Sequence, residues 1–332
     1  MEISVIIPVY NAAGFVEKAV DSAIQFEDVK EVLLIEDRST DNSLQVCKGL
    51  LEKDIRIKIF QHPDKGNHGA GATRNLGITN ASFEFIAFLD ADDFYLPNRF
   101  DADKKVFAEN PDADGVYNAL GFFYYSQSLR FDDYSKGQET LSTIRDRISP
   151  ELLPYALIGE PKHIGYITLD ALTIRKELAL KGGLFNEKLK LHQDTDFIFK
   201  LSLVGKLLPG EIKKPVGMRG VHNNNRSLDI PNLIQTRKLL HKSISDWCMS
   251  NSLDKELTDV ATNKYYISLM SDSSFLVRVL IFIKRIATNK SFFLRPRFFN
   301  PAIKMITGDG FHYRLIIKTK EKCQLILGYS LD

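Results

Sequence analysis

The sequence of 332 residues has little cysteine. Its three cysteines lie far apart, at Cys47, Cys248 and Cys323, and show none of the short spacings of a zinc site. This excludes a disulfide-rich secreted scaffold, and we expect reduced thiols in a reducing compartment, the cytoplasm. The sequence also lacks the basic start and long apolar stretch of a signal peptide, and it has no apolar run long enough to span a bilayer.

An excess of one charge is also missing from the chain as a whole. The net charge is +2 and 26% of the residues are charged, so no strong bias indicates binding to nucleic acid. With 44% hydrophobic residues and this length, the chain can bury a large core with an appendage beside it. The average hides a basic C-terminal part, because between residues 275 and 322 the only acids are Asp309 and Glu321.

Short apolar runs alternate with helix-period segments in the first part of the sequence. This alternation is typical of a mostly parallel sheet with crossover helices, an α/β fold. Expected strands cover residues 3–9, 32–35, 55–60, 83–89, 115–125 and 166–174, and expected helices cover 13–24, 39–53, 72–79, 98–109 and 194–204. Beyond residue 227 the pattern becomes mainly helical. We therefore predict an α/β domain over residues 1–227 and a mainly helical extension over residues 228–332.

Polar clusters follow three of the expected strands. They are Tyr10-Asn11, Glu36-Asp37 and the run Asp90-Ala91-Asp92-Asp93. In an open α/β sheet, ligands bind outside the carboxyl ends of the strands, where these three clusters would meet. The Asp-x-Asp pattern supplies the oxygen ligands that Mg²⁺ or Mn²⁺ prefers, and it leaves room for diphosphate oxygens. Taken alone, the same residues also fit a solvated acidic turn that caps the next helix.

A glycine-rich segment, residues 66–75, precedes one of the expected helices. It lacks the Gly-Lys-Ser/Thr ending of a Walker A loop. It also departs from the dinucleotide-binding fingerprint, because Arg74 stands where the third glycine belongs. A helix entered through glycines still suits an anionic ligand, since free backbone N–H groups point out of its start.

Taken together, these segments resemble the family 2 glycosyltransferases with the GT-A fold. The resemblance covers about residues 3–227, and its ordered motifs are residues 5–11, 36–43, 67–77, 88–93, 183–187 and 192–197. It implies a nucleotide-binding, mostly parallel sheet flanked by helices, with nucleotide-sugar binding in about residues 1–120 and an acceptor part in about residues 121–227. It also implies an inverting transfer of a hexosyl or N-acetylhexosaminyl group from a nucleotide diphosphate donor, with uridine favoured.

The resemblance also implies roles for individual residues. The residues implied in nucleotide-sugar binding are Pro8, Val9, Tyr10, Asn11, Asp37, Asn67, Gly69, Arg74, Asp90, Ala91 and Asp92. Among them, Tyr10 would stack on the base and Asp37 would read its edge. Asp92 would be the main ligand of Mn²⁺ or Mg²⁺, together with Asp90 and His222. Asp194 would be the catalytic base.

Two motifs depart from the family's usual pattern. Members usually have Asp-Asp-Gly where this chain has Glu36-Asp37-Arg38, and Glu-Asp where it has Gln193-Asp194. We expect an altered pocket rim and an altered acceptor contact. From the residues alone, Asp194 is equally a helix N-cap and His222 equally a structural histidine. A non-catalytic nucleotide-sugar-binding protein, which Gln193 favours, and another nucleotide-dependent α/β enzyme remain as alternatives.

The extension contains an amphipathic segment. Phe275, Val279, Phe282 and Ile286 share one helical face, and Arg278 and Arg285 share another. Apolar anchors beside cations suit an anionic lipid surface. We therefore expect peripheral contact of residues 275–300 with the inner face of the plasma membrane, where a saccharide or lipid-linked saccharide acceptor for cell-surface polysaccharide synthesis would be found. The alternative is a helix packed on the catalytic domain.

Overall fold

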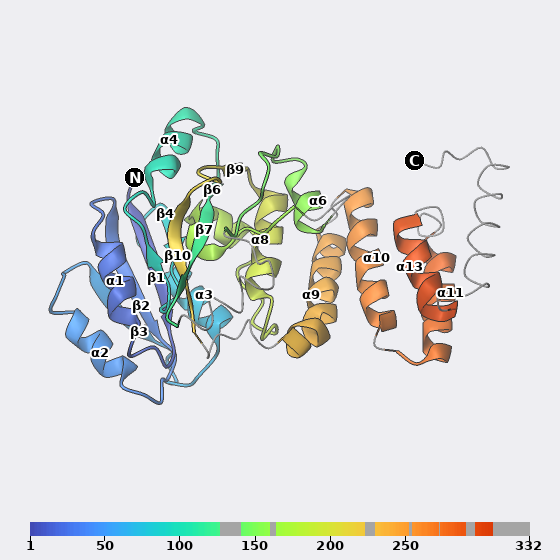
Figure 1. Cartoon of the computed structure of the whole chain (residues 1–332), viewed down its shortest axis with the longest axis horizontal. Helices are drawn as coiled ribbons and strands as arrows, with labels where there is room; N and C mark the ends of the chain where they lie inside the picture. Colours follow the sequence, from blue (N-terminus) through green and yellow to red (C-terminus); the bar gives the residue numbers. More distant parts are fainter. Residues whose placement is uncertain are drawn as a thin grey trace. The chain divides into compact units, whose positions relative to one another are not determined.

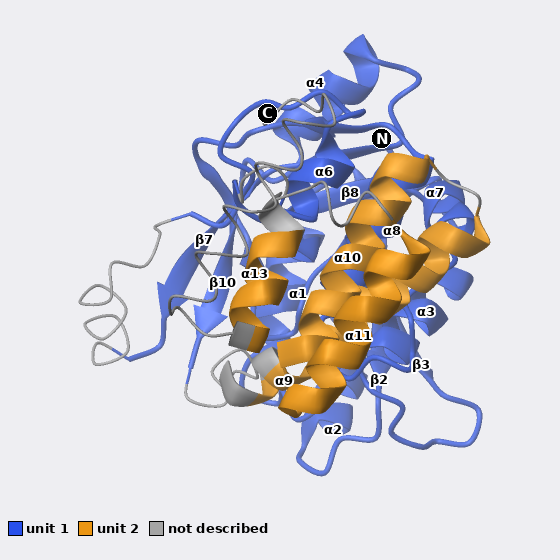
Figure 2. Ribbon diagram, turned by 90° about the vertical axis from the view of Figure 1, so that its right-hand side faces the viewer, with its two compact units in different colours: residues 1–229 blue, residues 230–332 orange. Residues whose placement is uncertain are grey.

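The structure is a computed structural model that describes residues 1–126, 141–159, 164–222, 230–251, 254–271, 273–289 and 296–307 (Figure 1). The chain divides into two compact units, residues 1–229 and residues 230–332 (Figure 2). The sequence predicted a boundary two residues earlier, between residues 227 and 228. Among the described residues, none of the helices combines the length and apolar character that crossing a membrane requires.

A seven-stranded sheet forms the centre of the first unit, in the order β3-β2-β1-β4-β8-β6-β9. Its strands are β1 Ile3–Val9, β2 Val29–Glu36, β3 Ile57–Gln61, β4 Phe85–Phe88, β6 Gly115–Tyr117, β8 Leu172–Arg175 and β9 Leu207–Pro209. β1 is parallel to β2 and β4, β2 to β3, and β6 to β9, whereas β8 runs antiparallel to β4 and β6. The prediction of an α/β fold with a mostly parallel sheet is therefore confirmed.

Helices cover both faces of this sheet. They are α1 Val16–Ile24, α2 Ser43–Leu50, α3 Ala70–Asn80, α4 Asp101–Glu109, α6 Leu153–Leu157, α7 Lys176–Lys181 and α8 Gln193–Val204. Val5 and Val20 belong to one apolar cluster, with α1 and α4, while Ile6 and Phe197 belong to another, with α3 and α8. Successive residues of β1 thus point into different layers, which is why this strand is apolar on both faces.

A second, three-stranded sheet has the order β5-β10-β7. It consists of β5 Phe94–Tyr95, β10 Pro215–Val221 and β7 Ala119–Tyr124. The sequence predicted one strand over residues 115–125, and this is wrong. Between β6 and β7 the buried side chain of Asn118 donates to Asp103 Oδ1 (2.7 Å), and the chain passes from the large sheet to the small one.

The predicted strand over residues 166–174 is also only partly present. Residues Leu169–Ala171 form a 3₁₀ turn, η1, and β8 begins only at Leu172. In this turn the Asp170 carboxylate accepts a hydrogen bond from Asp90 N at 2.6 Å. A contact with the turn that follows β4 therefore replaces three residues of extended strand.

The described residues of the second unit form the helices α9 Ile230–Ser250, α10 Lys255–Ser271, α11 Phe275–Thr288 and α13 Pro296–Thr307. The α11 face expected to be an apolar anchor is partly used inside the unit, since the Phe282 ring packs on Phe299 with centroids 5.4 Å apart. The cations are used there too: Arg285 Nε donates to Asn263 Oδ1 (2.7 Å) and Arg278 Nη1 to a backbone carbonyl (2.8 Å). The most exposed apolar side chains of α11 are Leu276, Leu280, Ile283 and Phe275, and of these only Phe275 belongs to the expected face.

Candidate functional site

The three polar clusters predicted at strand ends meet at one edge of the large sheet. The parallel register pairs Val9 with Glu36, and Asp37 N donates to Val9 O at 2.9 Å. Leu89 N donates to Ile6 O (3.0 Å), which places Asp90 beside the end of β1. Pro8, Val9, Asp37 and Asp90 therefore line the same carboxyl edge, where open α/β sheets bind ligands.

The two residues after β1 extend this edge. Asn11 Oδ1 accepts a hydrogen bond from Thr40 N at 2.8 Å, and Asn11 N donates to Ser39 Oγ at 3.1 Å. Tyr10 is 44% exposed. Arg38 adopts φ +57°, a conformation that favours glycine, at the position where family members usually carry glycine. The departure at Arg38 therefore keeps the local backbone shape while adding a large side chain.

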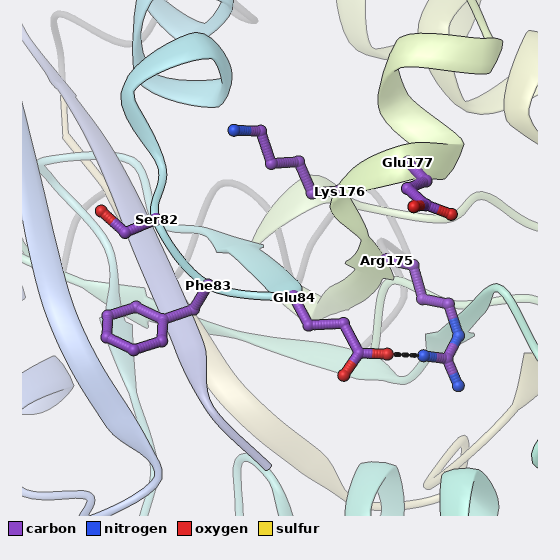
Figure 3. Close-up of a pocket in the computed structure, with 6 residues that line it drawn as sticks. All are labelled: Ser82, Phe83, Glu84, Arg175, Lys176 and Glu177. Carbon is purple, nitrogen blue, oxygen red and sulfur yellow. Dashed lines mark hydrogen bonds and ion pairs between the residues drawn. The ribbon is translucent and has the colours of Figure 1, made fainter.

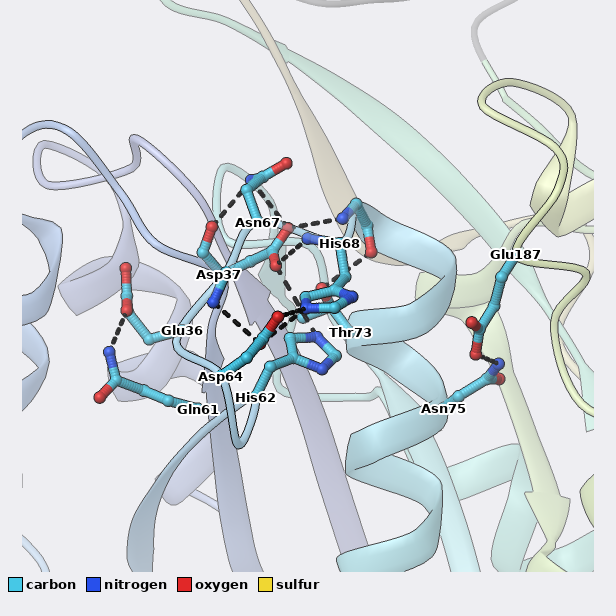
Figure 4. A network of polar contacts seen from close by, with 12 residues as sticks. Glu36, Asp37, Gln61, His62, Asp64, Asn67, His68, Thr73, Asn75 and Glu187 are labelled. Atoms are coloured by element: carbon cyan, nitrogen blue, oxygen red, sulfur yellow. Dashed lines mark hydrogen bonds and ion pairs between the residues drawn. The ribbon is translucent and has the colours of Figure 1, made fainter.

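The Asp37 carboxylate holds the glycine-rich segment against the end of β2 (Figure 4). Its Oδ1 accepts from His68 N (2.7 Å), and its Oδ2 accepts from Gly69 N (2.8 Å) and Asn67 Nδ2 (3.0 Å). Only 3% of Asp37 is exposed. This contact could not be predicted, because an aspartate after a strand can either bind a base or hold a neighbouring loop, and the sequence does not distinguish these two roles.

Two histidines without an assigned role lie here, His68 within this loop and His62 just before it. The rings of His62 and His68 are in contact, with centroids 4.1 Å apart, and His68 Nε2 is 2.8 Å from Asp64 Oδ1. Gly69 follows with φ +86° and precedes the first residue of α3. Only glycine adopts this conformation without strain, so the glycine sets the direction in which α3 leaves the loop.

Carboxylates after β4 form the one cluster of metal-ligating type found among the described residues. Ligand oxygens of Asp90, Asp92 and Asp93 all lie within 4.8 Å of one another. The side chains of Asp90 and Asp92 are 38% and 29% exposed, whereas Asp93 is buried. His222, directly after β10, brings its Nε2 to 2.9 Å from Asp92 Oδ2. Carboxylate oxygens and one imidazole nitrogen are a donor set that fits Mg²⁺ or Mn²⁺.

Aromatic rings fix the position of His222. Phe15 stacks on the imidazole with centroids 4.8 Å apart and planes inclined by 16°, and the Tyr125 ring meets it edge-on at 6.2 Å. Tyr125 also contacts Phe15 and Phe123, both with centroids at 5.1 Å. No pattern in the sequence indicates this cluster, because its rings come from the start of α1, the end of β7 and the segment after β10.

Arg74 is a buried cation beside the acids. It lies in α3, and its Nη2 donates to Asp90 Oδ1 at 2.5 Å. Burial alone would lower the pKa of Arg74, but the negative charges of Asp90 and Asp194 raise it. Its Nε is buried without a hydrogen-bond partner in the described structure. Together with the start of α3, this guanidinium makes the edge of the sheet attractive to an anion.

Asp194 lies at the start of α8 and is exposed. Its Oδ1 accepts a hydrogen bond from Thr195 N at 2.8 Å. The preceding residue, Gln193, lies against Gly71 at the start of α3, since a Cβ on Gly71 would be 2.9 Å from Gln193 Nε2. The starts of α3 and α8 are therefore adjacent. Asp194 lies close enough to Arg74 for its negative charge to raise the pKa of the Arg74 guanidinium.

A pair of buried carboxyls lies behind the cluster. Asp93 Oδ1 accepts from Gly220 N (2.8 Å), and the side chains of Asp93 and Asp170 are hydrogen-bonded to each other. Burial, together with the charges of Asp170, Asp92 and Asp90, raises the pKa of Asp93 well above its usual range. Burial likewise raises the pKa of Asp170, to about 7. The sequence did not mark Asp170, which lies far along the chain from Asp90.

A hollow of about 410 Å³ lies elsewhere, at the start of β4 and the end of β8 (Figure 3). Its lining is Ser82, Phe83, Glu84, Arg175, Lys176 and Glu177. Glu84 and Arg175 form an ion pair there. Because β4 runs from this end towards Asp90, the hollow is at the opposite edge of the sheet and is separate from the acid cluster.

Comparisons with known proteins fit this geometry. Residues 4–149 match the family described as Glycosyl transferase family 2. Chondroitin synthase of Pasteurella multocida strain Pm70 is 29% identical over 270 residues, which are 80% of this chain and 25% of that protein. The chain spans less than half the length of the curated relatives it matches.

Two solved structures share the fold. Staphylococcus aureus TarS 1–349 in complex with UDP-GlcNAc matches with a TM-score of 0.59 at 17% identity, covering 100% of this chain and 93% of that one. The mannosyltransferase PcManGT from Pyrobaculum calidifontis, in complex with GDP-Man and Mn²⁺, matches with a TM-score of 0.53 at 13% identity, covering 98% and 80%. At these identities the likeness shows the fold.

Proposed function

Because the chain belongs to glycosyltransferase family 2, we propose that its first unit transfers a sugar from a nucleotide diphosphate donor to an acceptor hydroxyl. The observation that carries this proposal is the convergence on one sheet edge of the Asp90–Asp92–His222 cluster, the buried cation Arg74 and the exposed carboxylate of Asp194. The metal-binding cluster and the Arg74 cation would bind the donor diphosphate, and the Asp194 carboxylate would accept the proton of the acceptor hydroxyl.

The nucleoside would bind at the end of β1 and β2. Pro8, Val9, Tyr10 and Asn11 form one side of this edge, and Asn67 and Gly69, fixed by Asp37, form the other. The half-exposed Tyr10 ring is available to stack on a base. The TarS complex with UDP-GlcNAc supports a uridine donor.

Asp92, Asp90 and His222 would hold Mn²⁺ or Mg²⁺, and the buried Ala91 lies between the two aspartates. A bound divalent cation supplies the charge that stabilises a departing diphosphate. The Arg74 guanidinium adds a fixed positive charge beside Asp90, and burial shields it from water. The presence of Mn²⁺ in the PcManGT complex supports a divalent metal in this fold.

Asp194 would be the catalytic base. It takes the proton of the acceptor hydroxyl, the oxygen of that hydroxyl attacks the anomeric carbon, and the bond to the nucleoside diphosphate breaks. With one base and a single displacement, the configuration at the anomeric carbon inverts. The exposure of Asp194 and its adjacency to Arg74 favour this role over that of a helix cap alone.

We further propose that α11 touches a lipid surface and brings the enzyme to a lipid-linked saccharide at the inner face of the membrane. Leu276, Leu280 and Ile283 are 72%, 66% and 58% exposed and recur at the spacing of one helical face. In sedimentation with anionic vesicles, Leu280→Asp should abolish binding, whereas Ile55→Asp, at a 96% exposed position in the first unit, should leave it intact. Equal binding of both variants would remove the lipid surface from the proposal.

A screen of nucleotide sugars with acceptor saccharides tests the main proposal. We expect turnover that requires Mn²⁺ or Mg²⁺, stops on chelation, and gives a product whose anomeric configuration is opposite to that of the donor. Donor binding without metal-dependent transfer or hydrolysis would instead favour a non-catalytic nucleotide-sugar-binding protein.

A further inference from the structure

Asp170 lies beneath the acidic turn, although it belongs to a distant part of the chain. It is in the 3₁₀ turn η1, and only 6% of it is exposed. Its Oδ1 accepts from Asp90 N at 2.6 Å, at the beginning of the turn, and its side chain is hydrogen-bonded to that of Asp93, at the end. Asp93 N donates to Asp90 O at 3.0 Å and closes the turn. One carboxyl therefore holds both ends.

Asp93 extends this contact to a third segment. Its Oδ1 accepts from Gly220 N (2.8 Å) in β10, and a Cβ on Gly220 would be 2.2 Å from Asp92 O. β10 thus lies directly against the acidic turn, and two residues later it supplies His222, whose Nε2 is 2.9 Å from Asp92 Oδ2. The path from Asp170 through Asp93 to β10 fixes both parts of the candidate metal cluster.

The backbone of Asp170 is fixed from inside the core. The buried Arg99 donates from Nε to Asp170 O at 3.0 Å and from Nη2 to Leu172 O at 3.1 Å. Its Nη1 donates to Asp103 at 2.8 Å. Burying a carboxyl carries a large desolvation cost. Removing this carboxyl would leave Asp90 N, at the beginning of the turn, without its acceptor.

We propose that Asp170 is a positioning residue that sets the geometry of Asp90, Asp92 and His222 and thereby the affinity of the site for a divalent cation. The inference rests on the proposed function, because it assumes that this cluster binds the donor's metal. Groups that hydrogen-bond to metal ligands from behind typically change metal affinity by about 10- to 100-fold when they are removed.

Two substitutions separate positioning from simple stabilisation. Asp170→Ala removes both contacts with the turn. Asp170→Asn keeps an oxygen that can accept from Asp90 N and gains an amide that can donate to Asp93, so it should rescue the geometry. Thr173→Ala is the matched control: Thr173 is buried and donates to Asp103 Oδ2 at 2.5 Å in the same Arg99 network, with no contact to the turn among its hydrogen bonds in the structure.

Mn²⁺ binding to the full chain, followed by the electron paramagnetic resonance signal of free Mn²⁺ without any nucleotide, gives a readout independent of activity. We expect Asp170→Ala to weaken binding about 10- to 100-fold. Asp170→Asn and Thr173→Ala should stay within about threefold of the parent protein, even where thermal melting shows Thr173→Ala to be destabilised. If Asp170→Ala does not fold, Asp170→Ser takes its place.

Unchanged affinity in Asp170→Ala overturns the inference and leaves the proposed function standing. An equal loss in Thr173→Ala also overturns it, because the effect would then come from stability. Failure of both Asp170→Ala and Asp170→Ser to fold shows a structural role and overturns it as well. A parent protein that binds no Mn²⁺ in the presence or absence of UDP refutes the metal site itself, and with it both proposals.

Discussion

Two aspartates at the start of α8 should respond to the same substitution in opposite ways. Asp194 is exposed and accepts one hydrogen bond from Thr195 N, which an asparagine oxygen at this position can still accept. Asp196, two residues later, is fully buried and pairs with Lys200 at 2.6 Å. We propose the first as the base, and the second contributes to the fold.

The magnitudes follow from these contacts. Asp194→Asn keeps an N-cap-type acceptor, so its effect on stability should stay below the ~1 kcal/mol typical of a lost cap. Removal of a base should slow transfer by about 10²- to 10⁴-fold. Asp196→Asn leaves the buried Lys200 ammonium without a counter-charge, and breaking such a pair destabilises by about 3–5 kcal/mol.

The assay combines initial rates of transfer, with the donor and acceptor found in the screen, and urea unfolding of each variant. We expect Asp194→Asn to be stable, to bind nucleotide and to be almost inactive. Asp196→Asn should be strongly destabilised, with a much smaller loss of rate in the fraction that stays folded. Turnover by Asp194→Asn within tenfold of the parent protein would refute the assignment of the base.

Three further predictions concern other parts of the first unit. Phe15→Ala removes the ring that stacks on His222, so Mn²⁺ affinity in a binding titration should fall about tenfold, and an unchanged affinity would show that the stack has no bearing on the metal. Burial alone would raise the pKa of Glu31, but the ion pair with Lys58 and nearby hydrogen-bond donors lower it. The ionised Glu31 carboxylate therefore stabilises the folded chain above its ordinary pKa near 4.5, and this stabilisation is lost as the pH falls through the lower pKa of the folded state. Glu31→Gln should reduce the loss of unfolding free energy between pH 6 and pH 3. An unaltered pH dependence of the unfolding free energy would contradict this. Burial raises the pKa of the Cys47 thiol to about 12, so iodoacetamide at pH 8 should modify it only after unfolding, and peptide mapping that found rapid labelling of the folded protein would contradict the burial.

Much of the first part of the chain could be predicted from the sequence. β1, β2 and β4 are short apolar runs that end in polar residues, and this local pattern fixes both the strand and the place where it ends. The turn Asp90-Ala91-Asp92 and the glycine-rich entry to α3 can also be predicted from their local residue patterns. In these segments the cause of the structure is local, so the sequence carries it.

The errors come from contacts between distant residues. Residues 115–125 are apolar throughout, and only the buried hydrogen bond of Asn118 to Asp103 explains why the strand divides between two sheets. Asp170 lies in an apolar stretch typical of a strand, and its role depends on the return of that segment to the acidic turn. Asp37 illustrates a further limit, because a pattern locates a carboxylate at a site without telling which donors it accepts from.

The predicted membrane segment was assigned from helical spacing, and spacing alone does not tell which face is covered. Phe282 packs on Phe299, and Arg285 is buried with Asn263, so part of the expected lipid-facing set serves the fold of the second unit. The exposed residues Leu276 and Leu280 lie on a different face. Packing against α10 and α13 determines which of the two apolar faces of α11 is buried. The sequence of α11 alone does not contain this information.

The most direct test of the account is a crystal structure of the full chain grown with UDP and Mn²⁺. We predict Mn²⁺ at about 2.1 Å from an Asp92 carboxylate oxygen, in contact with the diphosphate, and the Asp194 carboxylate facing the same cleft. A diphosphate bound away from the Asp90–Asp92 turn, or a metal held without Asp92, would contradict it.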